Sequence, residues 1–264
     1  MVNTADDSFY LTLTFIIIMS IIGIIPARFA SSRFPGKPLA QINGKTMLQR
    51  VVEQAKKVNS LSEIIVATDD KRIVDHCKEI HVNCVMTNSN HQSGTDRCFE
   101  AFKLSASNAN YIINIQGDEP FLHPDQINSL VKACDGDAQL ITQMIKCNSH
   151  SVLFDTGEVK IVLNENNEAL YFSRSIIPFI KNEAEENWHV KHDYYRHVGM
   201  YAYRSDILEQ ISKLPVSSLE KAESLEQLRW LQHGLKIKCV ITAHDSHCID
   251  TPEDIEKVLK LLSN

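Results

Sequence analysis

A short apolar strand that runs directly into a basic loop constrains this chain more than any other feature. The segment from Gly23 to Leu39 reads GIIPARFASSRFPGKPL, and small residues lie between its charges Arg28, Arg33 and Lys37. No Asp or Glu occurs from Ser8 to Val52, although the whole chain has a formal net charge of -6. Arg binds phosphate oxygens through paired hydrogen bonds, Lys acts as a mobile charge, and small residues let backbone N–H groups approach. The loop therefore predicts a polyphosphate site at the end of the first strand.

The two best-known phosphate-binding motifs do not fit this loop. Lys37 is followed by Pro38, and Ser31 stands where a Walker loop begins with Gly. Lys45 has Leu39 at that place, and no GxGxxG sequence opens a helix after the strand. The alternative is an ordinary solvated basic loop. The spacing favours a nucleoside triphosphate site of a third kind.

The composition is that of one large domain, or of one domain with a subdomain. The chain has 264 residues, of which 44 % are hydrophobic, and it carries no basic tract outside the loop. That charge distribution argues against nucleic acid as a partner and suits a small anion better. The seven cysteines form no CxxC pair, and no Cys or His set has the spacing of a zinc site. We therefore expect reduced, buried thiols.

Apolar strand patterns alternate with helical patterns in the first half, which is typical of a parallel sheet with helices on both faces. After about residue 138 the pattern changes to strands with turns. We expect there, at about 138–203, an inserted antiparallel subdomain that forms a lid and a dimer surface. The expected class is α/β, with a mostly parallel Rossmann-like sheet and a smaller antiparallel extension. The expected strands are Ile21–Pro26, Ile64–Thr68, Asn83–Met86, Tyr111–Gln116, Val159–Leu163, Tyr171–Arg174, His197–Tyr203 and Lys238–Thr242, and the expected helices are Met47–Val58, Lys71–Ile80, Asp96–Ala106, Pro124–Cys134, Ser218–His233 and Pro252–Leu262.

Two aspartates stand at the ends of expected elements. Asp118 follows an apolar strand and Gly117, and Asp250 precedes a helix that Thr251 is expected to cap. Ligands of such sheets bind beyond the carboxyl ends of the strands, and a hard cation prefers carboxylate oxygen. The spacing alone leaves two alternatives open, a turn residue for Asp118 and an additional helix cap for Asp250.

Seven sequence blocks in register resemble one family. The loop PARFASSRFPGKPL is similar to the signature loop of sugar nucleotidyltransferases, and in particular to that of the 3-deoxy-manno-octulosonate cytidylyltransferases. The other blocks cover nearly all of the chain from Met19 onward: HQSGTDR from His91, NIQGDEP from Asn114, LYFSRSIIP from Leu170, RHVGMYAYR from Arg196, LEQLRWL from Leu225 and IDTPEDI from Ile249.

The resemblance implies the fold of nucleotide-diphospho-sugar transferases and a defined reaction. CMP would pass from CTP to 3-deoxy-D-manno-octulosonate (Kdo), giving CMP-Kdo and pyrophosphate for lipopolysaccharide biosynthesis. The resemblance also implies Mg²⁺ as the cofactor and a cytoplasmic homodimer whose partners are CTP and Kdo, without nucleic acid.

Residue roles follow from the same resemblance. The implied catalytic residues are Arg28, Lys37, Asp118 and Asp250, and the two aspartates are the implied magnesium ligands. The implied nucleotide-binding residues are Ala27, Arg28, Ser31, Ser32, Arg33, Lys37, Ser93, Gly94, Thr95 and Arg97. The implied Kdo-binding residues are Gln116, Arg174, His197, Tyr201, Glu226 and Gln227. Arg174 suits the sugar carboxylate, whereas His197 has the alternative of an ordinary core histidine.

Two rival functions share part of this sequence pattern. An acylneuraminate cytidylyltransferase carries a Gly-Gly-Ser-Lys stretch in the loop, where this chain has Phe29-Ala30-Ser31-Ser32-Arg33. A module that senses CTP without catalysis is a rival of another class. The intact set of implied catalytic residues argues against it.

The N-terminus is uncharged over positions 8 to 27, which is almost long enough to span a bilayer. Asp6 and Asp7 precede this run, where a signal peptide carries positive charge, and no A-x-A cleavage site follows. The second half of the run is also needed as the first strand. We therefore interpret residues 1–18 as an extension or a misassigned start before Met19, with 19–264 as a single nucleotidyltransferase domain, and expect no stable membrane contact. A membrane anchor is the main alternative.

Overall fold

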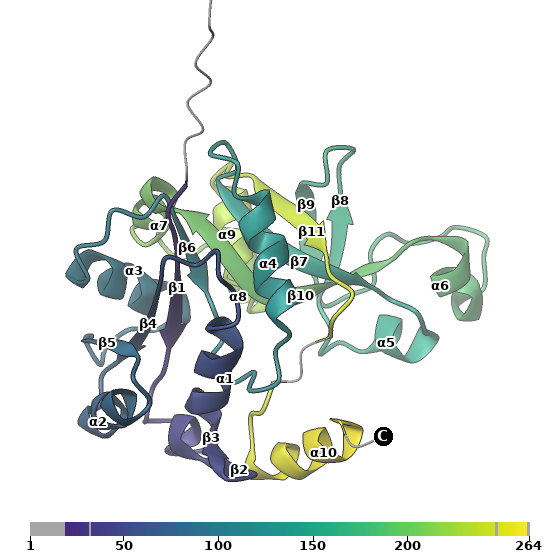
Figure 1. Ribbon diagram of the computed structural model, residues 1–264. Helices are drawn as coiled ribbons and strands as arrows, with labels where there is room; N and C mark the ends of the chain where they lie inside the picture. Colours follow the sequence, from purple (N-terminus) through teal and green to yellow (C-terminus); the bar gives the residue numbers. More distant parts are fainter. Residues whose placement is uncertain (1–18, 32, 246–247, 263–264) are drawn as a thin grey trace, which may run out of the picture.

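The computed structural model describes residues 19–31, 33–245 and 248–262 (Figure 1). Residues 1–18, for which an extension or an anchor was expected, lie outside the described residues, and so does Ser32. Among the helices that are described, none is long and apolar enough to cross a membrane.

A nine-stranded mixed sheet forms the centre of the molecule. Its main path runs β11-β7-β10-β6-β1-β4-β5, and β8 and β9 continue it from β10. Pairing is parallel from β6 through β1 and β4 to β5 and between β11 and β7, whereas β10 is antiparallel to both of its neighbours. The expected α/β class is confirmed. The strands are β1 Ile21–Pro26, β4 Glu63–Thr68, β5 Asn83–Met86, β6 Tyr111–Asn114, β7 Leu140–Lys146, β8 Lys160–Leu163, β9 Ala169–Ser173, β10 Tyr195–Arg204 and β11 Ile237–Ile241, and β2 Gln41–Ile42 pairs with β3 Lys45–Thr46 in a separate hairpin.

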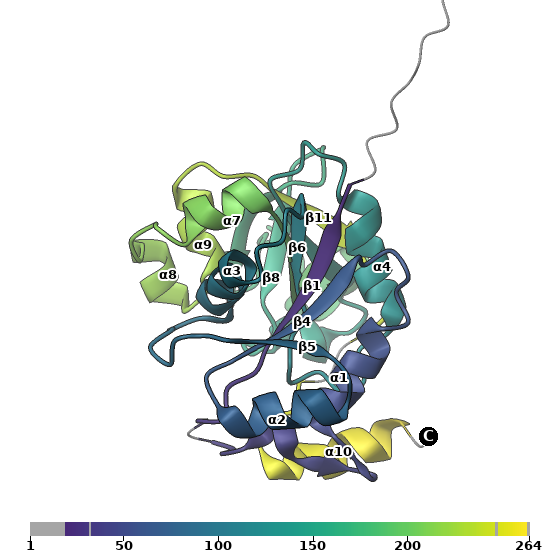
Figure 2. The same cartoon turned by 60° about the vertical axis from the view of Figure 1, so that its left-hand side comes forward.

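Alternation along β1 creates two cores. Ile22 and Ile24 pack into a cluster on one face of the sheet, while Ile21 and Ile25 pack into another cluster on the other face. A strand with apolar residues on both sides must be covered twice. Figure 2 shows α3, α7 and α9 on one side of the sheet and α1 and α4 on the other. The larger helices are α1 Met47–Ala55, α2 Lys71–Glu79, α3 Gly94–Leu104, α4 Pro124–Ala133, α7 Ser205–Ile211 and α10 Pro252–Leu262.

The prediction of a single helix over Ser218–His233 is wrong. The structure has α8 Ser218–Glu223 and α9 Gln227–Gln232, separated by Ser224 in a left-handed conformation with φ +55°. The break turns Leu225 into the core, where it is 7 % exposed. Apolar spacing continues across the two helices, so it did not reveal the turn.

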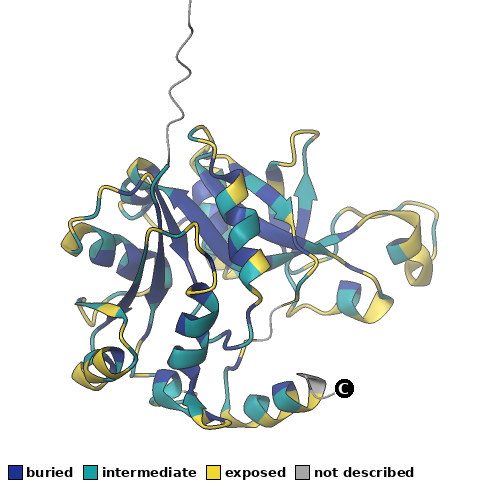
Figure 3. Cartoon of the chain, in the orientation of Figure 1, coloured by how far each residue is buried: buried dark blue, intermediate teal, exposed yellow. Residues whose placement is uncertain are grey.

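The range 138–203 contains two kinds of structure. β7 and β10 lie on the main path of the sheet, and β8 and β9 branch from it at β10. α5 His150–Phe154 and α6 Trp188–Lys191 project beyond these strands (Figure 1). Burial colouring shows the part around α5 and α6 as mostly exposed or intermediate (Figure 3). Trp188 is nevertheless buried, in a small cluster with Leu153 and Tyr194. The lid and dimer roles of this range stay predictions.

Candidate active site

The basic loop is folded back on itself after β1. The Ala27 N–H donates to the Ala67 carbonyl at 2.8 Å, and the Gly36 N–H donates to the Phe29 carbonyl at 2.9 Å. Gly36 has φ +73°, and a Cβ there would lie 3.1 Å from Cζ of Phe29. A glycine is therefore needed at this turn, both for its conformation and for space. The Arg72 guanidinium covers the other side of the loop, 3.2 Å from the centre of the Phe29 ring.

The segment after β6 lies against the end of β1. A Cβ on Gly117 would be 2.7 Å from the Pro26 carbonyl oxygen, so only glycine permits this approach. Asp118 follows directly. Its carbonyl accepts the N–H of Ile249 at 3.0 Å, which joins this segment to the chain that leads into α10.

The Asp254 carboxylate, and not that of Asp250, holds the backbone at the start of α10. One Asp254 carboxylate oxygen accepts the N–H groups of Thr251 at 2.9 Å and Asp250 at 3.2 Å, and also the Thr251 hydroxyl at 3.1 Å. The Asp250 carboxylate instead lies 3.0 Å from Nη1 of Arg33. Asp250 thus faces the basic loop, as its implied site role requires.

Lys37 lies at the centre of the site. Its Nζ donates to Asp118 Oδ2 at 2.8 Å, to the Ile249 carbonyl at 2.8 Å and to Asp250 Oδ1 at 3.3 Å. Burial lowers the pKa of Lys37, but the Asp118 carboxylate and then Asp250 outweigh it, and the net pKa is raised. The ammonium is therefore fully charged at neutral pH.

A cavity of about 410 Å³ opens above these groups. Arg97 at its edge is 1 % exposed and fixed, because it donates to Thr87 Oγ1 at 2.6 Å and to Asp69 Oδ2 at 3.1 Å. Arg28 is exposed and makes one long contact, 3.5 Å from Nη1 to the His91 carbonyl. The cavity brings together these residues expected from the sequence: Ala27, Arg28, Ser31, Arg33, Lys37, Gly94, Arg97, Gln116, Asp118 and Asp250.

A second cavity of about 350 Å³ shares Gly94, Gln116 and Asp118 with the first. It also contains Thr95, His197, Tyr201 and Glu226 from the expected sugar-binding and nucleotide-binding sets.

Two titratable groups of the second cavity are tuned by burial. Burial raises the pKa of Glu226, although it accepts hydrogen bonds from the hydroxyls of Thr95, at 2.8 Å, and Ser93. Burial and then the nearby Arg196 lower the pKa of His197 to about 3, so its imidazole is neutral. His197 Nε2 lies 2.9 Å from Thr142 Oγ1.

Of the expected residues that the structure describes, three lie outside the walls of both cavities. Ser93 caps α3, with its hydroxyl accepting the Asp96 N–H at 3.1 Å. Gln227 is buried in α9. Arg174 is held by the backbone, since its Nε donates to the Glu223 carbonyl at 2.9 Å and its Nη1 to the Thr156 carbonyl at 3.2 Å. The structure therefore does not place Arg174 in the cavity that its expected role requires.

Five residues that line the second cavity were not expected from the sequence, namely Asn114, Glu119, Gly199, Tyr203 and Cys248. Asn114 is a polar residue in an otherwise apolar strand, which was an available signal. Its Nδ2 donates to the Tyr203 hydroxyl at 3.4 Å. Cys248 had no signal beyond its position two residues before Asp250.

The donor set near Lys37 fits a magnesium ion. Ligand atoms of Asp118, Cys248 and Asp250 all lie within 4.8 Å of one another. Two carboxylates suit a hard cation. Cys248 is exposed by surface area, but its sulfur lies in a partly desolvated position beside these carboxylates, and both effects raise the pKa of its thiol.

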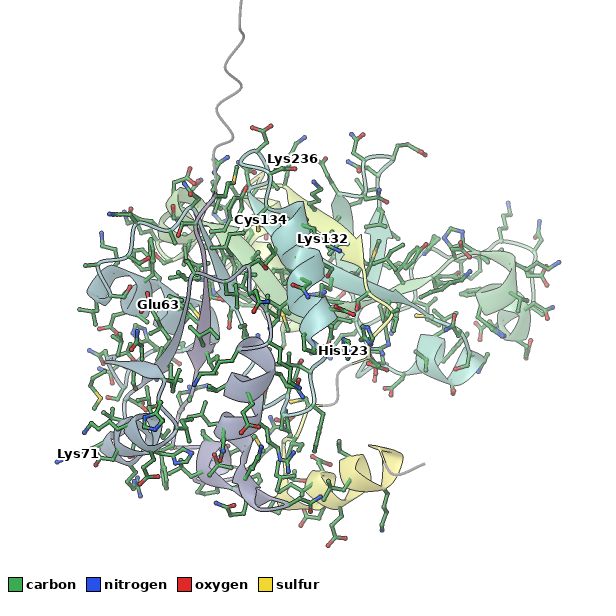
Figure 4. All side chains as sticks on the ribbon, in the orientation of Figure 1. Glu63, Lys71, His123, Lys132, Cys134 and Lys236 are labelled. Atoms are coloured by element: carbon green, nitrogen blue, oxygen red, sulfur yellow. The ribbon has the colours of Figure 1, made fainter. Side chains whose placement is uncertain are left out.

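A second cluster of possible ligands lies at the start of α4, where Figure 4 labels His123, and includes Asp125 and His244. The rings of His123 and His244 are stacked, with centroids 3.7 Å apart and planes 11° apart. Nδ1 of His123 accepts the Asp125 N–H at 3.2 Å and caps the helix. The lone pair of Nδ1 is therefore used in a helix-capping contact.

Comparisons with known proteins agree with this geometry. The model of the family described as Cytidylyltransferase matches residues 22–237. The 3-deoxy-manno-octulosonate cytidylyltransferase of Parabacteroides distasonis is 53 % identical over 252 residues, covering 93 % of this chain and 99 % of that protein. The 8-amino-3,8-dideoxy-manno-octulosonate cytidylyltransferase of Shewanella pealeana is 43 % identical over 241 residues, covering 90 % and 96 %.

A solved structure of CMP:2-keto-3-deoxy-manno-octonic acid synthetase complexed with CTP is also similar. Its TM-score is 0.85 at 40 % sequence identity, and the match covers 92 % of this chain and 98 % of that one.

The chain belongs to the cytidylyltransferase family. Within it, the sequence places the chain among the 3-deoxy-manno-octulosonate cytidylyltransferases, as the seven sequence blocks predicted.

Proposed function

We propose that this protein transfers CMP from CTP to Kdo and releases pyrophosphate. The observation that carries the proposal is the meeting of two cavities at Asp118, one lined by the basic loop and the other by hydroxyl, amide and carboxyl groups. The first suits a triphosphate and the second a polyhydroxylated sugar. The named relatives and the CTP-bound neighbour support the same pair of substrates.

In the reaction, the anomeric hydroxyl oxygen of Kdo forms a bond to the α-phosphorus of CTP while the bond from that phosphorus to the pyrophosphate oxygen breaks. The hydroxyl proton leaves to solvent. Such transfer needs positioning and charge stabilisation more than covalent help from the protein. Arg28, Arg33 and Lys37 hold the phosphates from the loop, and the rigid ends of β1 and β6 fix the angle between the two substrates.

Asp118 and Asp250 would hold Mg²⁺, because their carboxylates face each other across Lys37. When bound, the ion would offset the negative charge of the triphosphate and lower the pKa of the attacking hydroxyl. Asp250 is not needed to hold the start of α10, because Asp254 accepts the backbone N–H groups there.

The sugar cavity carries polar groups in fixed positions. Gln116 Nε2 donates to the Gly199 carbonyl at 2.9 Å, which orients its amide toward the cavity wall. Neutral His197 and the half-buried Glu226 add further partners for sugar hydroxyls. Arg174 as the partner of the Kdo carboxylate remains a proposal that requires this side chain to leave its backbone contacts.

The setting of the reaction is proposed from the same properties. All seven cysteines are free, as expected for a reducing cytoplasm, where CTP is available for lipopolysaccharide precursors. A homodimer is proposed through the projecting region. Phe179 there is 72 % exposed, Val190 is 69 % exposed, and the Phe179 ring packs against Trp188 at 5.0 Å. Exposed large apolar groups on a projection are typical of an interface.

The test is pyrophosphate release with CTP or UTP, each combined with Kdo, 8-amino-3,8-dideoxy-Kdo or neuraminic acid. The 8-amino sugar is included because one relative is named for it. We expect turnover with CTP and Kdo and hardly any with neuraminic acid. If the protein prefers the 8-amino sugar, that sugar and not Kdo is its substrate. If no sugar leads to pyrophosphate release, the protein is a CTP-binding module and not an enzyme of this kind.

A further inference from the structure

The ammonium of Lys37 occupies the place where a cation would bind. Three oxygen atoms surround its Nζ within 3.3 Å, from Asp118, Asp250 and the Ile249 carbonyl. Two of these oxygens belong to the proposed magnesium ligands. The Lys37 side chain is only 15 % exposed, so this is an enclosed contact and not a surface pair.

The charges of this cluster balance without a metal ion. Asp118 and Asp250 together carry two negative charges, and Lys37 and Arg33 bring two positive charges against them. A divalent cation that entered the free protein would have to displace an ammonium from both carboxylates. It would also meet the repulsion of the displaced charge, because the Lys37 stem keeps its ammonium nearby.

A triphosphate changes this balance. Arg33 and Lys37 also line the 410 Å³ cavity, so both can turn from the carboxylates to phosphate oxygens that enter it. Lys has a flexible stem and a compact charge, which suits such a transfer between partners.

We infer that Lys37 closes the cation site of the nucleotide-free protein and that CTP opens it by drawing Lys37 away from Asp118 and Asp250. This inference rests on the proposed function and specifies how its two ligands are coupled. Coupling of this kind is reciprocal, so a bound cation should strengthen CTP binding by the same factor as bound CTP strengthens cation binding.

The first experiment measures Mn²⁺ binding to the nucleotide-free protein by the electron paramagnetic resonance signal of free Mn²⁺. Wild type should bind weakly. Lys37→Met removes one positive charge about 4 Å from the cation and should tighten binding by about 30-fold. Lys45→Met is the matched control, because it removes an equal charge from the same basic segment, where Lys45 pairs with Glu53 at 2.6 Å. If Lys37→Met melts early, Lys37→Gln takes its place.

The second experiment measures CTP binding calorimetrically in EDTA with a double-mutant cycle. Asp118→Asn should strengthen CTP binding in the wild-type background, because Lys37 is then freed for the phosphates. In the Lys37→Met background the same substitution should give no such gain. Simple repulsion between Asp118 and phosphate would give the gain in both backgrounds, which is why the cycle isolates the contact.

Equal Mn²⁺ affinities of Lys37→Met and Lys45→Met would overturn the inference, and so would a gain from Asp118→Asn that survives without Lys37. Neither experiment uses Kdo or turnover. A failure of the proposed reaction therefore appears in the pyrophosphate assay of the wild type, whereas a failure of this inference appears only in the two binding measurements.

Discussion

Replacing Asp250 by Asn should abolish catalysis and leave the fold intact. The substitution keeps the shape of the side chain and removes its charge. In the structure, that charge faces Arg33 at 3.0 Å and Lys37 at 3.3 Å, while α10 is capped by Asp254. The sequence alone left Asp250 as either a ligand or a helix cap, and in the structure the contacts at the start of α10 are made by Asp254.

The expected effects differ in size. The Arg33 and Asp250 side chains are 65 % and 38 % exposed, so losing their ion pair should lower the free energy of unfolding by less than about 1 kcal/mol. Lys37 keeps its contacts with Asp118 and the Ile249 carbonyl. Losing a charge that holds the cofactor at the reacting phosphate should reduce turnover by roughly a hundredfold or more.

Asp254→Ala is the matched control. It removes the acceptor of two backbone N–H groups and should cost about 1 kcal/mol of stability with turnover largely kept. The measurements are thermal unfolding and pyrophosphate release over a range of Mg²⁺ concentrations. An active Asp250→Asn protein with unchanged magnesium dependence would refute the reasoning, as would a loss of stability equal to that of Asp254→Ala.

The basic loop and the sugar cavity give three further predictions. Arg28→Ala should weaken CTP binding by roughly 10- to 150-fold in calorimetry, because a charge-assisted contact is lost. The melting temperature without ligand should stay unchanged in thermal melts, since Arg28 makes only one 3.5 Å contact. Gly36→Ala should lower stability by about 1 kcal/mol or more and should also weaken CTP binding, because Gly36 has φ +73° and Phe29 leaves no room for a Cβ. A stable variant with normal CTP affinity would contradict this. The pKa of His197 is lowered from 6.5 to about 3 in the folded protein, so the unfolded chain binds a proton more readily and stability is lost as the pH falls below 6.5. His197→Asn should remove up to about 2 kcal/mol of that loss at pH 5, as measured by unfolding curves at pH 5 and 7.5.

The parts of the fold that were predictable are those in which one local signal dominates. Ile21–Pro26 and Asn83–Met86 agree with the expected strands, and Pro252–Leu262 agrees with the expected helix. In each, an apolar pattern is bounded by residues that stop or start the element. The helix over Ser218–His233 failed because the left-handed Ser224 is chosen by the burial of Leu225, which is a tertiary effect.

The site was predictable where it follows the strand ends and not where it depends on side-chain direction. Asp118 lies at the carboxyl end of β6, as the parallel pattern required. Arg174 follows β9, and no feature of its sequence shows that Glu223 and Thr156 would hold its guanidinium. Asn114 was overlooked because a single polar residue in an apolar strand more often satisfies the core than a ligand.

The position of Asp250 has a different origin from that of the other site residues. The basic loop and Asp118 lie at the ends of neighbouring parallel strands, so the sheet itself brings them together. Asp250 precedes the last helix and is separated by residues 242–249 from β11, which ends at the same edge. Its place is fixed by apolar packing, because Ile249 and Val258 join Ile42 and Met47 in one buried cluster. The short β2–β3 hairpin and the start of α1 therefore support α10, and hydrophobic contacts position the second carboxylate of the proposed cation site.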